Sequence, residues 1–303
     1  MHHTQSPTLK ELRHHGTKTF PFAAYKTCFA TQGTMVKHHW HDEIEMIYFF
    51  EGDFRLEINM EPFHIRSECL YFINPGELHS IVIENNNCSE EKAIVFSSDI
   101  LSCECYDAVQ VQLIQPIRHG KMLFPRCLLP EHPCFIPIRD SFIDIMRIYE
   151  QPVTKNDAFD HLTNQLYIKS SLLRILALLS AHKLFVHSEK NYDKRVEEIK
   201  KIIIYITENY KEKIYIHDLA SLVNMNEQYF CRFFKKAIGS SPMSYVNDYR
   251  IKQAIHLLKE TELTIMEISL ECGFNNVGNF LKEFRKHTNT TPLKYRKNHV
   301  QKI

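Results

Sequence analysis

The last third of the chain has the hydrophobic period of short amphipathic helices separated by turn residues. Thr264 and Glu267 have the spacing of a capping box, in which the hydroxyl and the carboxylate each satisfy a backbone N–H at a helix start. This helix should end next to Gly273, which favours the left-handed backbone of a turn, and Asn275 or Asn276 can cap a second helix. The stretch 264–296 therefore predicts a helix, a tight turn and another helix.

The second helix of this stretch has distinct inner and outer faces. Phe280 and Phe284 are four residues apart and share one face, which predicts that both rings pack inward. The residues that project elsewhere are Gly278, Leu281, Lys282 and Arg285. A helix, a turn and a helix with a basic outer face form a unit that reads DNA.

The stretch 215–245 repeats this pattern at a constant offset of 50 residues, with one residue of slippage before the turn. The matching pairs are Phe230 with Phe280, Arg232 with Lys282, Phe234 with Phe284, Lys235 with Arg285, Pro242 with Pro292 and Tyr245 with Tyr295. In the first copy the inner stripe consists of Phe230, Phe233, Phe234 and Ala237. The residues outside it are Gln228, Cys231, Arg232, Lys235 and Lys236. The chain thus contains one reading unit twice.

A longer helix is expected between the two copies. Ser241 is a preferred cap and Pro242 a preferred first residue, and the helix should run to about residue 260. Its roughly 18 residues span about 27 Å, which is close to the ~34 Å between successive major-groove faces of a duplex. One subunit could therefore place both reading helices in adjacent grooves. The alternative is a plain helical bundle whose basic residues form a solvated face.

Residues 20–100 alternate apolar and polar positions over short runs that end at turn residues. The runs are IEMIYFF, FRLEINM, CLYFI, HSIVI and KAIVF. Many short strands at this spacing predict a small antiparallel barrel or sandwich. Residues 101–140 hold most of the remaining prolines and predict loops with at most one further strand.

From Phe142 the hydrophobic period becomes helical. One helix is expected over FIDIMRIY and another from Ala158 to about Leu184, with a broad apolar face that must pack on the barrel or on a second subunit. His187 to Tyr192 is polar and predicts a linker, and Asp193 should cap the next helix. The expected fold is α+β with two domains: an antiparallel β-barrel over 1–140, a helical pair over 141–186 that could dimerise, a linker over 187–193, and an all-α domain with two helix-turn-helix motifs over 194–303.

Charge is distributed unevenly along the chain, although the net charge is only +1. Residues 190–303 hold 20 Lys and Arg against 13 Asp and Glu, which is +7 and leaves −6 for residues 1–189. Only the last third therefore suits a polyanion such as DNA. No apolar run reaches the roughly 18 residues of a membrane span, and the first ten residues lack the apolar core of a signal peptide, so we expect a cytoplasmic protein that does not enter a membrane.

Nine cysteines are scattered through the chain, and in the cytoplasm we expect their thiols to stay reduced. Four of them could form a metal or redox cluster: Cys103, Cys105, Cys127 and Cys134. Their spacing fits no standard zinc pattern, so buried or idle thiols are the favoured interpretation.

Residues 194–297 resemble the DNA-binding domain of the AraC/XylS family of bacterial transcription regulators. The motifs that carry the resemblance are Asp218-Leu219-Ala220, the stretch from Tyr229-Phe230 to Lys235-Lys236, Gly239 to Pro242, Arg250 to Leu258, and Gly273-Phe274 to Pro292-Tyr295-Arg296. The resemblance implies base reading by Gln228, Cys231 and Arg232 in one helix and by Val277, Gly278, Leu281 and Lys282 in the other. It leaves phosphate contacts or solvated charges as roles for Lys235, Lys236, Arg285 and Lys286.

Two positions depart from that family, because Gly278 and Leu281 stand where it commonly carries polar residues. The second helix would then rely on apolar contact with thymine methyl groups and on phosphate contacts. Val277 has a competing interpretation as a core residue, since it lies three and four residues from Phe280 and Leu281. Arg232 is the stronger candidate, because its guanidinium matches the acceptors of guanine.

The amino-terminal domain resembles the first motif of the cupins in the spacing of Gly33, His39, His41, Glu45 and Gly52. The two histidines and the glutamate share parity, so on an uninterrupted strand they would point to one face. His79 from a later strand could join them, and we place Ile47 in the same pocket. Three interpretations stay open for these side chains: the polar lining of an effector pocket, a metal site, and structural hydrogen bonding.

These patterns predict a transcription regulator, not an enzyme, that binds double-stranded DNA under the control of a small molecule and needs no cofactor. By the resemblance, the effector would be a sugar or related metabolite, the regulator would act as an activator that contacts RNA polymerase, and residues 141–186 could form a homodimer. The competing classes are a metal-dependent cupin oxygenase or isomerase, and a regulator that senses metal or redox state through His and Cys residues.

Overall fold

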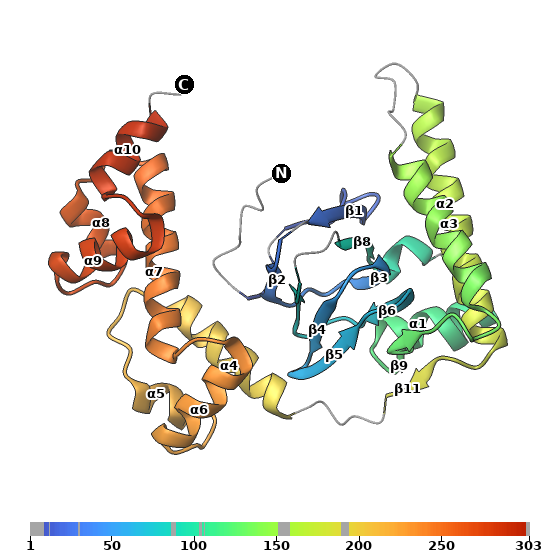
Figure 1. Cartoon of the computed structure of the whole chain (residues 1–303), viewed down its shortest axis with the longest axis horizontal. Helices are drawn as coiled ribbons and strands as arrows, with labels where there is room; N and C mark the ends of the chain where they lie inside the picture. Colours follow the sequence, from blue (N-terminus) through green and yellow to red (C-terminus); the bar gives the residue numbers. More distant parts are fainter. Residues whose placement is uncertain are drawn as a thin grey trace. The chain divides into compact units, whose positions relative to one another are not determined.

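A computed structural model describes residues 9–11, 13–29, 31–85, 89–102, 105, 107–150, 158–188 and 194–300. Contacts divide the chain into two compact units (Figure 1). One unit is Glu11–Tyr192, and the other is Met1–Lys10 together with Asp193–Ile303. Among the helices of the described residues, none is long and apolar enough to cross a membrane.

The amino-terminal unit is built on two antiparallel sheets. The order in the first sheet is β1 (Phe22–Phe29), β8 (Ser89–Phe96), β3 (Ile44–Glu51), β6 (Cys69–Ile73) and β10 (Cys127–Leu128). The order in the second sheet is β2 (Gly33–His39), β7 (His79–Ile83), β4 (Phe54–Ile58) and β5 (Glu61–Ile65). Four of the five runs read from the sequence lie within one of these strands, and the fifth, FRLEINM, continues past the end of β4 into a turn at Asn59 and Met60. The predicted α+β fold class is confirmed.

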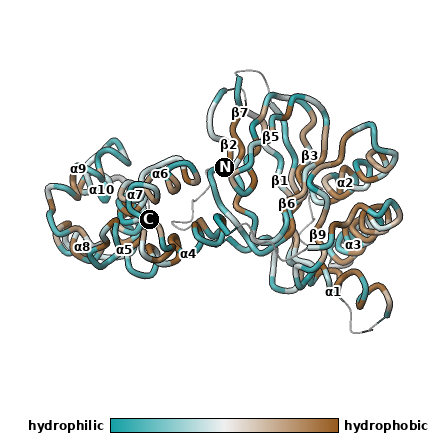
Figure 2. The backbone as a smooth tube through the Cα atoms, turned by 90° about the horizontal axis from the view of Figure 1, so that it is seen from below, coloured by the Kyte–Doolittle hydropathy of each residue, from teal (hydrophilic) through white to brown (hydrophobic). Residues whose placement is uncertain are grey.

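Alternation along the strands divides the apolar residues of the first sheet between two cores. In β3, Ile47 and Phe49 face the second sheet and pack with Phe54 and Leu56 of β4. The intervening residues of β3 face the opposite side of the first sheet, where they pack against helices. The strands and these helices both contain hydrophobic stretches (Figure 2). The first sheet is therefore buried on both faces.

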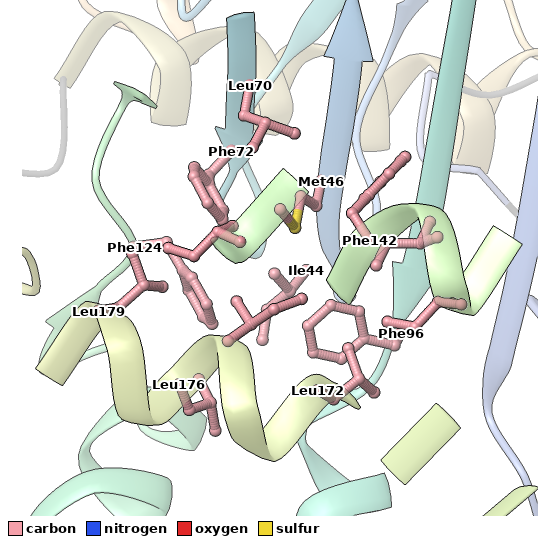
Figure 3. Close-up of a cluster of buried hydrophobic side chains, with 14 of the residues drawn as sticks. Ile44, Met46, Leu70, Phe72, Phe96, Phe124, Phe142, Leu172, Leu176 and Leu179 are labelled. Carbon is pink, nitrogen blue, oxygen red and sulfur yellow. The ribbon is translucent and has the colours of Figure 1, made fainter. Parts of the chain in front are cut away.

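Helices α2 (Phe135–Glu150) and α3 (Ala158–Ala181) cover the outer face of the first sheet. Their side chains Phe142, Leu172 and Leu176 lie against Ile44 and Phe96 of the strands (Figure 3). Of the two partners predicted for the apolar face of these helices, the barrel is thus the one that the structure shows.

The region 101–140 is more ordered than the sequence predicts. It contains a π-helical turn at Gln110–Ile114, α1 (Gln115–Arg118) and the short strands β9 (Met122–Leu123) and β10. Helix α2 begins at Phe135 rather than at Phe142, so the boundary proposed at residue 140 falls inside a helix. Pro137 suggested a loop, but a proline in the first helical turn lacks only an N–H that has no partner there.

The proposed linker is shorter at its amino-terminal end than predicted. Val186 and His187 form β11, in which His187 pairs with Met122 of β9. Residues 189–193 lie outside the described residues, and so does the cap proposed at Asp193.

The carboxy-terminal unit consists of helices joined by tight turns (Figure 1). They are α4 (Lys194–Asn209), α5 (Ile216–Ser221), α6 (Glu227–Ile238), α7 (Pro242–Glu260), α8 (Ile265–Glu271), α9 (Val277–Thr288) and α10 (Pro292–Val300). Helices α6 and α9 have 12 residues each and begin 50 residues apart, whereas α5 and α8 begin 49 apart. The predicted duplication and its single residue of slippage are confirmed.

The helix starts follow the capping residues in both copies. The Thr264 backbone N–H donates to Glu267 Oε2 at 2.7 Å, and the Glu267 N–H donates back to Thr264 Oγ1 at 3.2 Å. Asn226 caps α6 and Asn276 caps α9, each accepting from N–H groups of the first turn. Local hydrogen bonds therefore fix where each reading helix begins.

Helix α7 is tied to the loop between α4 and α5. The buried Arg250 side chain donates from Nε to the Tyr210 carbonyl at 2.8 Å and from its terminal nitrogen to the Glu212 carbonyl at 2.6 Å. Gly273, in the turn between α8 and α9, has φ +78° and lies against the same loop. The loop 210–212 thus contacts both α7 and the turn of the second helix-turn-helix copy.

We predict that Gly273→Ala destabilises the carboxy-terminal unit far more than Gly239→Ala. Both glycines are left-handed, with φ +78° and +80°, which costs an alanine about 1–2 kcal/mol. A Cβ at Gly273 would also lie 2.4 Å from the Tyr210 carbonyl oxygen, whereas a Cβ at Gly239 meets nothing within 4 Å. Denaturant unfolding followed by circular dichroism measures the difference, and equal losses would show that the loop 210–212 does not hold this turn.

Candidate functional site

The outer faces of α6 and α9 carry the residues proposed to read DNA. On α6, Gln228 and Arg232 are exposed and Cys231 is half-buried. On α9, Gly278, Leu281 and Lys282 are exposed. Val277 is half-buried, so it is neither a fully exposed reading residue nor a fully buried core residue. The four proposed phosphate contacts are also exposed: Lys235, Lys236, Arg285 and Lys286.

The inner faces explain why these side chains project outward. Phe230 and Phe234 of α6 and Phe280 and Phe284 of α9 are fully buried. Because the buried aromatic residues recur at a spacing of four, the positions between them must face solvent. Burial of the aromatic stripe is therefore enough to turn the proposed reading residues toward solvent in an ordinary α-helix.

In the amino-terminal unit, the two sheets bring together the four polar residues proposed from the sequence. Strand β2 ends at His39, His41 lies in the connection that follows, and Glu45 is in β3 of the other sheet. The assumption of one uninterrupted strand is therefore wrong. The residues converge because the chain crosses between sheets at this point, and because His39 is paired in register with His79 of β7.

Glu45 lies at the centre of this group, which we call the barrel cluster: His39, His41, Glu45 and His79. Its Oε2 atom is 3.2 Å from His41 Nε2 and 3.0 Å from His79 Nε2. The Nδ1 atom of each histidine lies 2.9 to 3.1 Å from a backbone carbonyl two residues away. A carbonyl only accepts, so each Nδ1 carries a proton and each Nε2 faces the cluster.

Three residues that the sequence analysis missed extend the cluster. Glu11 Oε2 lies 3.4 Å from both His39 Nε2 and His15 Nε2, and His15 Nδ1 lies 2.8 Å from the Tyr25 hydroxyl. Glu11 and His15 precede the first strand, and the Glu11 N–H donates to the Trp40 carbonyl. Nothing local in the sequence signals this contact, because it depends on where the segment before β1 folds.

The two units match two different family models. Residues 20–107 match an AraC-like ligand binding domain, and residues 219–298 match a helix-turn-helix domain. An uncharacterised helix-turn-helix transcriptional regulator of Bacillus subtilis, YdeC, is 29% identical over 300 residues, which cover 95% of this chain and 96% of that protein. The chain belongs to the AraC family.

Two further similar proteins have lower sequence identity. The melibiose operon regulatory protein of Escherichia coli K12 is 22% identical over 277 residues, which cover 89% of this chain and 86% of that protein. The crystal structure of the DNA-binding domain of AdpA with a target DNA is 24% identical, with a TM-score of 0.34, and covers 34% of this chain and 94% of that one.

Membership of the AraC family confirms the coarse functional prediction. The chain is a DNA-binding transcription regulator with a ligand-binding amino-terminal domain. This family is not enzymatic, so the rival prediction of a cupin oxygenase or isomerase is wrong.

In the barrel cluster of this AraC-family chain, the contact between His39 and Glu11 lacks a proton that could form a hydrogen bond. Burial and the neighbouring His79 lower the pKa of His39 to about 3, so its ring is neutral and its Nε2 atom is an acceptor. Although burial opposes ionisation, hydrogen bonds and histidine charges keep the pKa values of Glu11 and Glu45 lowered. Two acceptors, His39 Nε2 and Glu11 Oε2, therefore face each other at 3.4 Å, and a hydrogen-bond donor or a cation between them would satisfy both.

His41 is the histidine whose pKa responds most directly to Glu45. Burial opposes a charge on His41, yet the hydrogen bond and the charge of Glu45 raise its pKa overall. Ile47, which we placed in the pocket, is fully buried in the apolar core between the sheets. It can contribute an apolar wall but no polar contact.

Two cavities lie away from the barrel cluster. The larger, of about 650 Å³, is lined by residues in or next to β2, β4, β5 and β7: Gln32, Gly33, Thr34, Asp53, Arg55, Arg66, Val82, Ile83 and Glu84. Its charged residues already pair, with Arg55 Nε 3.3 Å from Glu84 and Arg66 Nε 3.4 Å from Asp53. We favour the barrel cluster over this cavity as the ligand site. In the barrel cluster two acceptors face each other without a donor between them, whereas the charged residues of the cavity are paired with one another.

The reading helices of this AraC-family chain also contain two exposed residues that the sequence analysis did not propose. Tyr229 is 51% exposed and stacks in parallel on Phe233, with centroids 6.5 Å apart. Asn279 occupies the same position in α9, 50 residues later, and is also exposed. Both lie off the stripe of buried aromatic residues, and helical periodicity alone could have identified them.

The three of these four cysteines that the structure describes, Cys105, Cys127 and Cys134, do not form a cluster with one another. Cys127 is half-buried in β10, Cys105 is exposed, and Cys134 is buried at the start of α2. Cys103 lies outside the described residues. In the described part of the chain, Cys134 groups with His132 and His182 instead of with Cys105 or Cys127.

We predict that Glu91→Gln raises the melting temperature, and that the gain grows from pH 5 to pH 8. Burial and the charge of Glu45 raise the pKa of Glu91 in β8 well above the usual range of a carboxyl, to about 8. The stability that the protonated carboxyl contributes is complete below the unfolded pKa and is lost as pH rises through the folded pKa. Thermal melts at both pH values measure the gain.

Glu90→Gln is the matched control, because Glu90 is half-buried beside Lys26 and Lys92 at the surface of the same strand. Its effect on the melting temperature should vary little over this pH range. A Glu91→Gln gain that is equal at pH 5 and pH 8 would contradict a buried, protonated Glu91.

Proposed function

We propose that this AraC-family regulator reads duplex DNA with α6 and α9 and that a sugar, bound at the barrel cluster, controls this reading. The proposal for DNA rests on one observation above others: the two reading helices present exposed residues at the same offset of 50. Arg232 and Lys282 occupy equivalent exposed positions in the two copies. Arg232 supplies two parallel donors for the O6 and N7 atoms of guanine.

The length of α7 supports simultaneous reading by both helices. Its 19 residues span about 28 Å, which is close to the ~34 Å between major-groove faces on one side of a duplex. In α9, the Leu281 side chain is 41% exposed and can contact a thymine methyl group. Beside Lys282, the second helix then contributes mainly apolar and phosphate contacts, and the first supplies most of the hydrogen bonds to bases.

A sugar suits the barrel cluster because a hydroxyl group both donates and accepts. The facing acceptors on His39 and Glu11 need a donor, and the neutral imidazole with its neighbouring carboxylates offers several acceptors in a small volume. A relative of similar length is named for the melibiose operon, which supports a sugar-related effector for this chain. A ligand that reaches His39 must also meet Glu11, so binding is expected to reorganise the segment before β1.

Control of DNA binding follows from unequal affinity. If the sugar binds one arrangement of the two units more tightly than another, it shifts the population toward that arrangement, and DNA responds to the shift.

A divalent metal is the second candidate for the barrel cluster. The four ligand atoms lie within 4.8 Å of one another, and each histidine donates its other ring N–H to a backbone carbonyl, as metal-ligating histidines do. His39, His41, Glu45 and His79 would hold the ion, which would supply a positive centre for a ligand's oxygen atoms. Metal analysis of protein purified without chelators separates this candidate from a metal-free sugar site.

We further propose that the protein is a dimeric activator. Leu162, Leu166 and Leu173 of α3 are 46–60% exposed, and their spacing places them on one face that a second copy can cover. Sedimentation of a monomer at micromolar concentration would contradict this dimer.

On α8, Met266 and Leu270 are exposed and could contact RNA polymerase. Undiminished reporter activation by Leu270→Asp would contradict that contact.

We predict that Arg232→Ala lowers the affinity for the operator roughly 10- to 100-fold, because one bidentate base contact is lost. Preference for guanine at one position should relax as well. Electrophoretic mobility shifts with operator variants, selected from random duplexes with the wild-type chain, measure both effects at a fixed salt concentration.

Lys194→Ala is the control for Arg232→Ala, since it also removes one positive charge and Lys194 is 90% exposed at the start of α4. Its effect on affinity should be small and equal for all operator variants. Equal losses for the two substitutions would reduce the role of Arg232 to general electrostatic attraction.

We predict that one member of a panel of mono- and disaccharides raises the melting temperature of the full chain. At a hundred times its dissociation constant, a ligand stabilises the native state by ~2.7 kcal/mol. His39→Gln should abolish this shift while leaving DNA binding in the absence of sugar unchanged. A panel without any shift, or a shift that His39→Gln preserves, would contradict a sugar at the barrel cluster.

A further inference from the structure

A second group of metal-ligating side chains lies outside the barrel cluster. His132 is in the loop before α2, Cys134 directly precedes α2, and His182 directly follows α3. One ligand atom from each lies within 4.8 Å of the other two. The group is assembled from positions about 50 residues apart in sequence, where the start of one helix meets the end of its antiparallel neighbour.

The contacts within the group are short. Cys134 Sγ lies 3.0 Å from His132 Nδ1. The rings of His132 and His182 are 5.4 Å apart and meet edge to face at 71°. A thiol–imidazole hydrogen bond explains the first contact, but it gives no reason for His182 to join the pair.

Backbone hydrogen bonds hold all three residues in place. The Ile138 N–H donates to the Cys134 carbonyl at 3.1 Å, which starts α2. The Phe135 N–H donates to the His132 carbonyl at 2.9 Å. The His182 N–H donates to the Leu178 carbonyl at 3.1 Å, which continues α3. The site is therefore largely organised before any ion binds, and little ordering opposes binding.

The donor set is that of a zinc site with one open position. One thiolate and two imidazoles suit Zn²⁺, which takes four ligands in a tetrahedron. Tetrahedral zinc at the usual bond lengths places sulfur and nitrogen ligands ~3.4–3.6 Å apart, so small side-chain rotations from the observed positions suffice. His182 is exposed, which leaves room for water as the fourth ligand.

We propose that His132, Cys134 and His182 bind a zinc ion that joins the loop before α2 to the end of α3. On binding, the Cys134 thiol loses its proton to solvent and a zinc–thiolate bond forms, with no change in oxidation state. The ion holds together the end of the helical pair whose apolar face covers the first sheet.

Cobalt titration of the reduced full chain tests this site, because a cobalt–thiolate bond gives a near-ultraviolet charge-transfer absorption that histidine and carboxylate ligands do not. We expect this absorption to saturate at one equivalent and to disappear on addition of zinc. Cys134→Ser should abolish it. His182→Ala should weaken cobalt binding at least about tenfold, since even partners outside the ligand shell contribute about 10- to 100-fold.

Two control variants separate this site from other metal binding. Cys127→Ser removes a half-buried thiol that belongs to neither metal-ligating group of the described residues, and it should keep the absorption. His39→Gln alters the barrel cluster and should also keep it. If Cys134→Ser fails to fold, as judged by circular dichroism, the exposed His182→Ala variant decides. No thiolate absorption in the wild type, or binding that His182→Ala leaves unchanged, would overturn the proposal.

Discussion

The arrangement of the reading helices depends on one buried guanidinium. Arg250 of α7 donates to the carbonyls of Tyr210 and Glu212, and it is only 8% exposed. A buried charge is costly unless its donors are satisfied, so these bonds are retained in the folded state. Gly273 lies against the same loop, close enough that a Cβ there would meet the Tyr210 carbonyl. The helix that connects the two copies is thereby held to the loop between α4 and α5, and the same loop packs against the turn of the second copy.

Local signals account for most of what the sequence predicted correctly in the carboxy-terminal unit. The capping box of Thr264 and Glu267 and the cap at Asn276 involve neighbours in the chain, so their geometry could be predicted from spacing alone. Asn289 and Gly239 show the same logic, since both are left-handed at the end of a reading helix. Contacts between distant segments, such as that of Gly273 with the loop at Tyr210, required the structure.

In the amino-terminal unit, local sequence signals predict less of the structure. The four residues of the barrel cluster lie together as the sequence suggested, but the geometric reason was wrong, because His39 and Glu45 belong to different sheets. Glu11, His15 and Glu91 were missed, since the first two depend on the fold of the segment before β1. Glu91 had a local signal, the parity it shares with the buried Ala93 and Val95. Cys134 joins His182 only because α2 and α3 are antiparallel, which no spacing rule for cysteines anticipates.

The central claim is that two equivalent helices of one chain read neighbouring major-groove segments. Methylation protection of guanine N7 on the operator, with the full chain and its variants, tests this most directly. We expect the wild type to protect two segments about one helical turn apart, with Arg232→Ala exposing one segment and Lys282→Ala the other. Loss of the same segment in both variants, or protection of a single segment by the wild type, would contradict it.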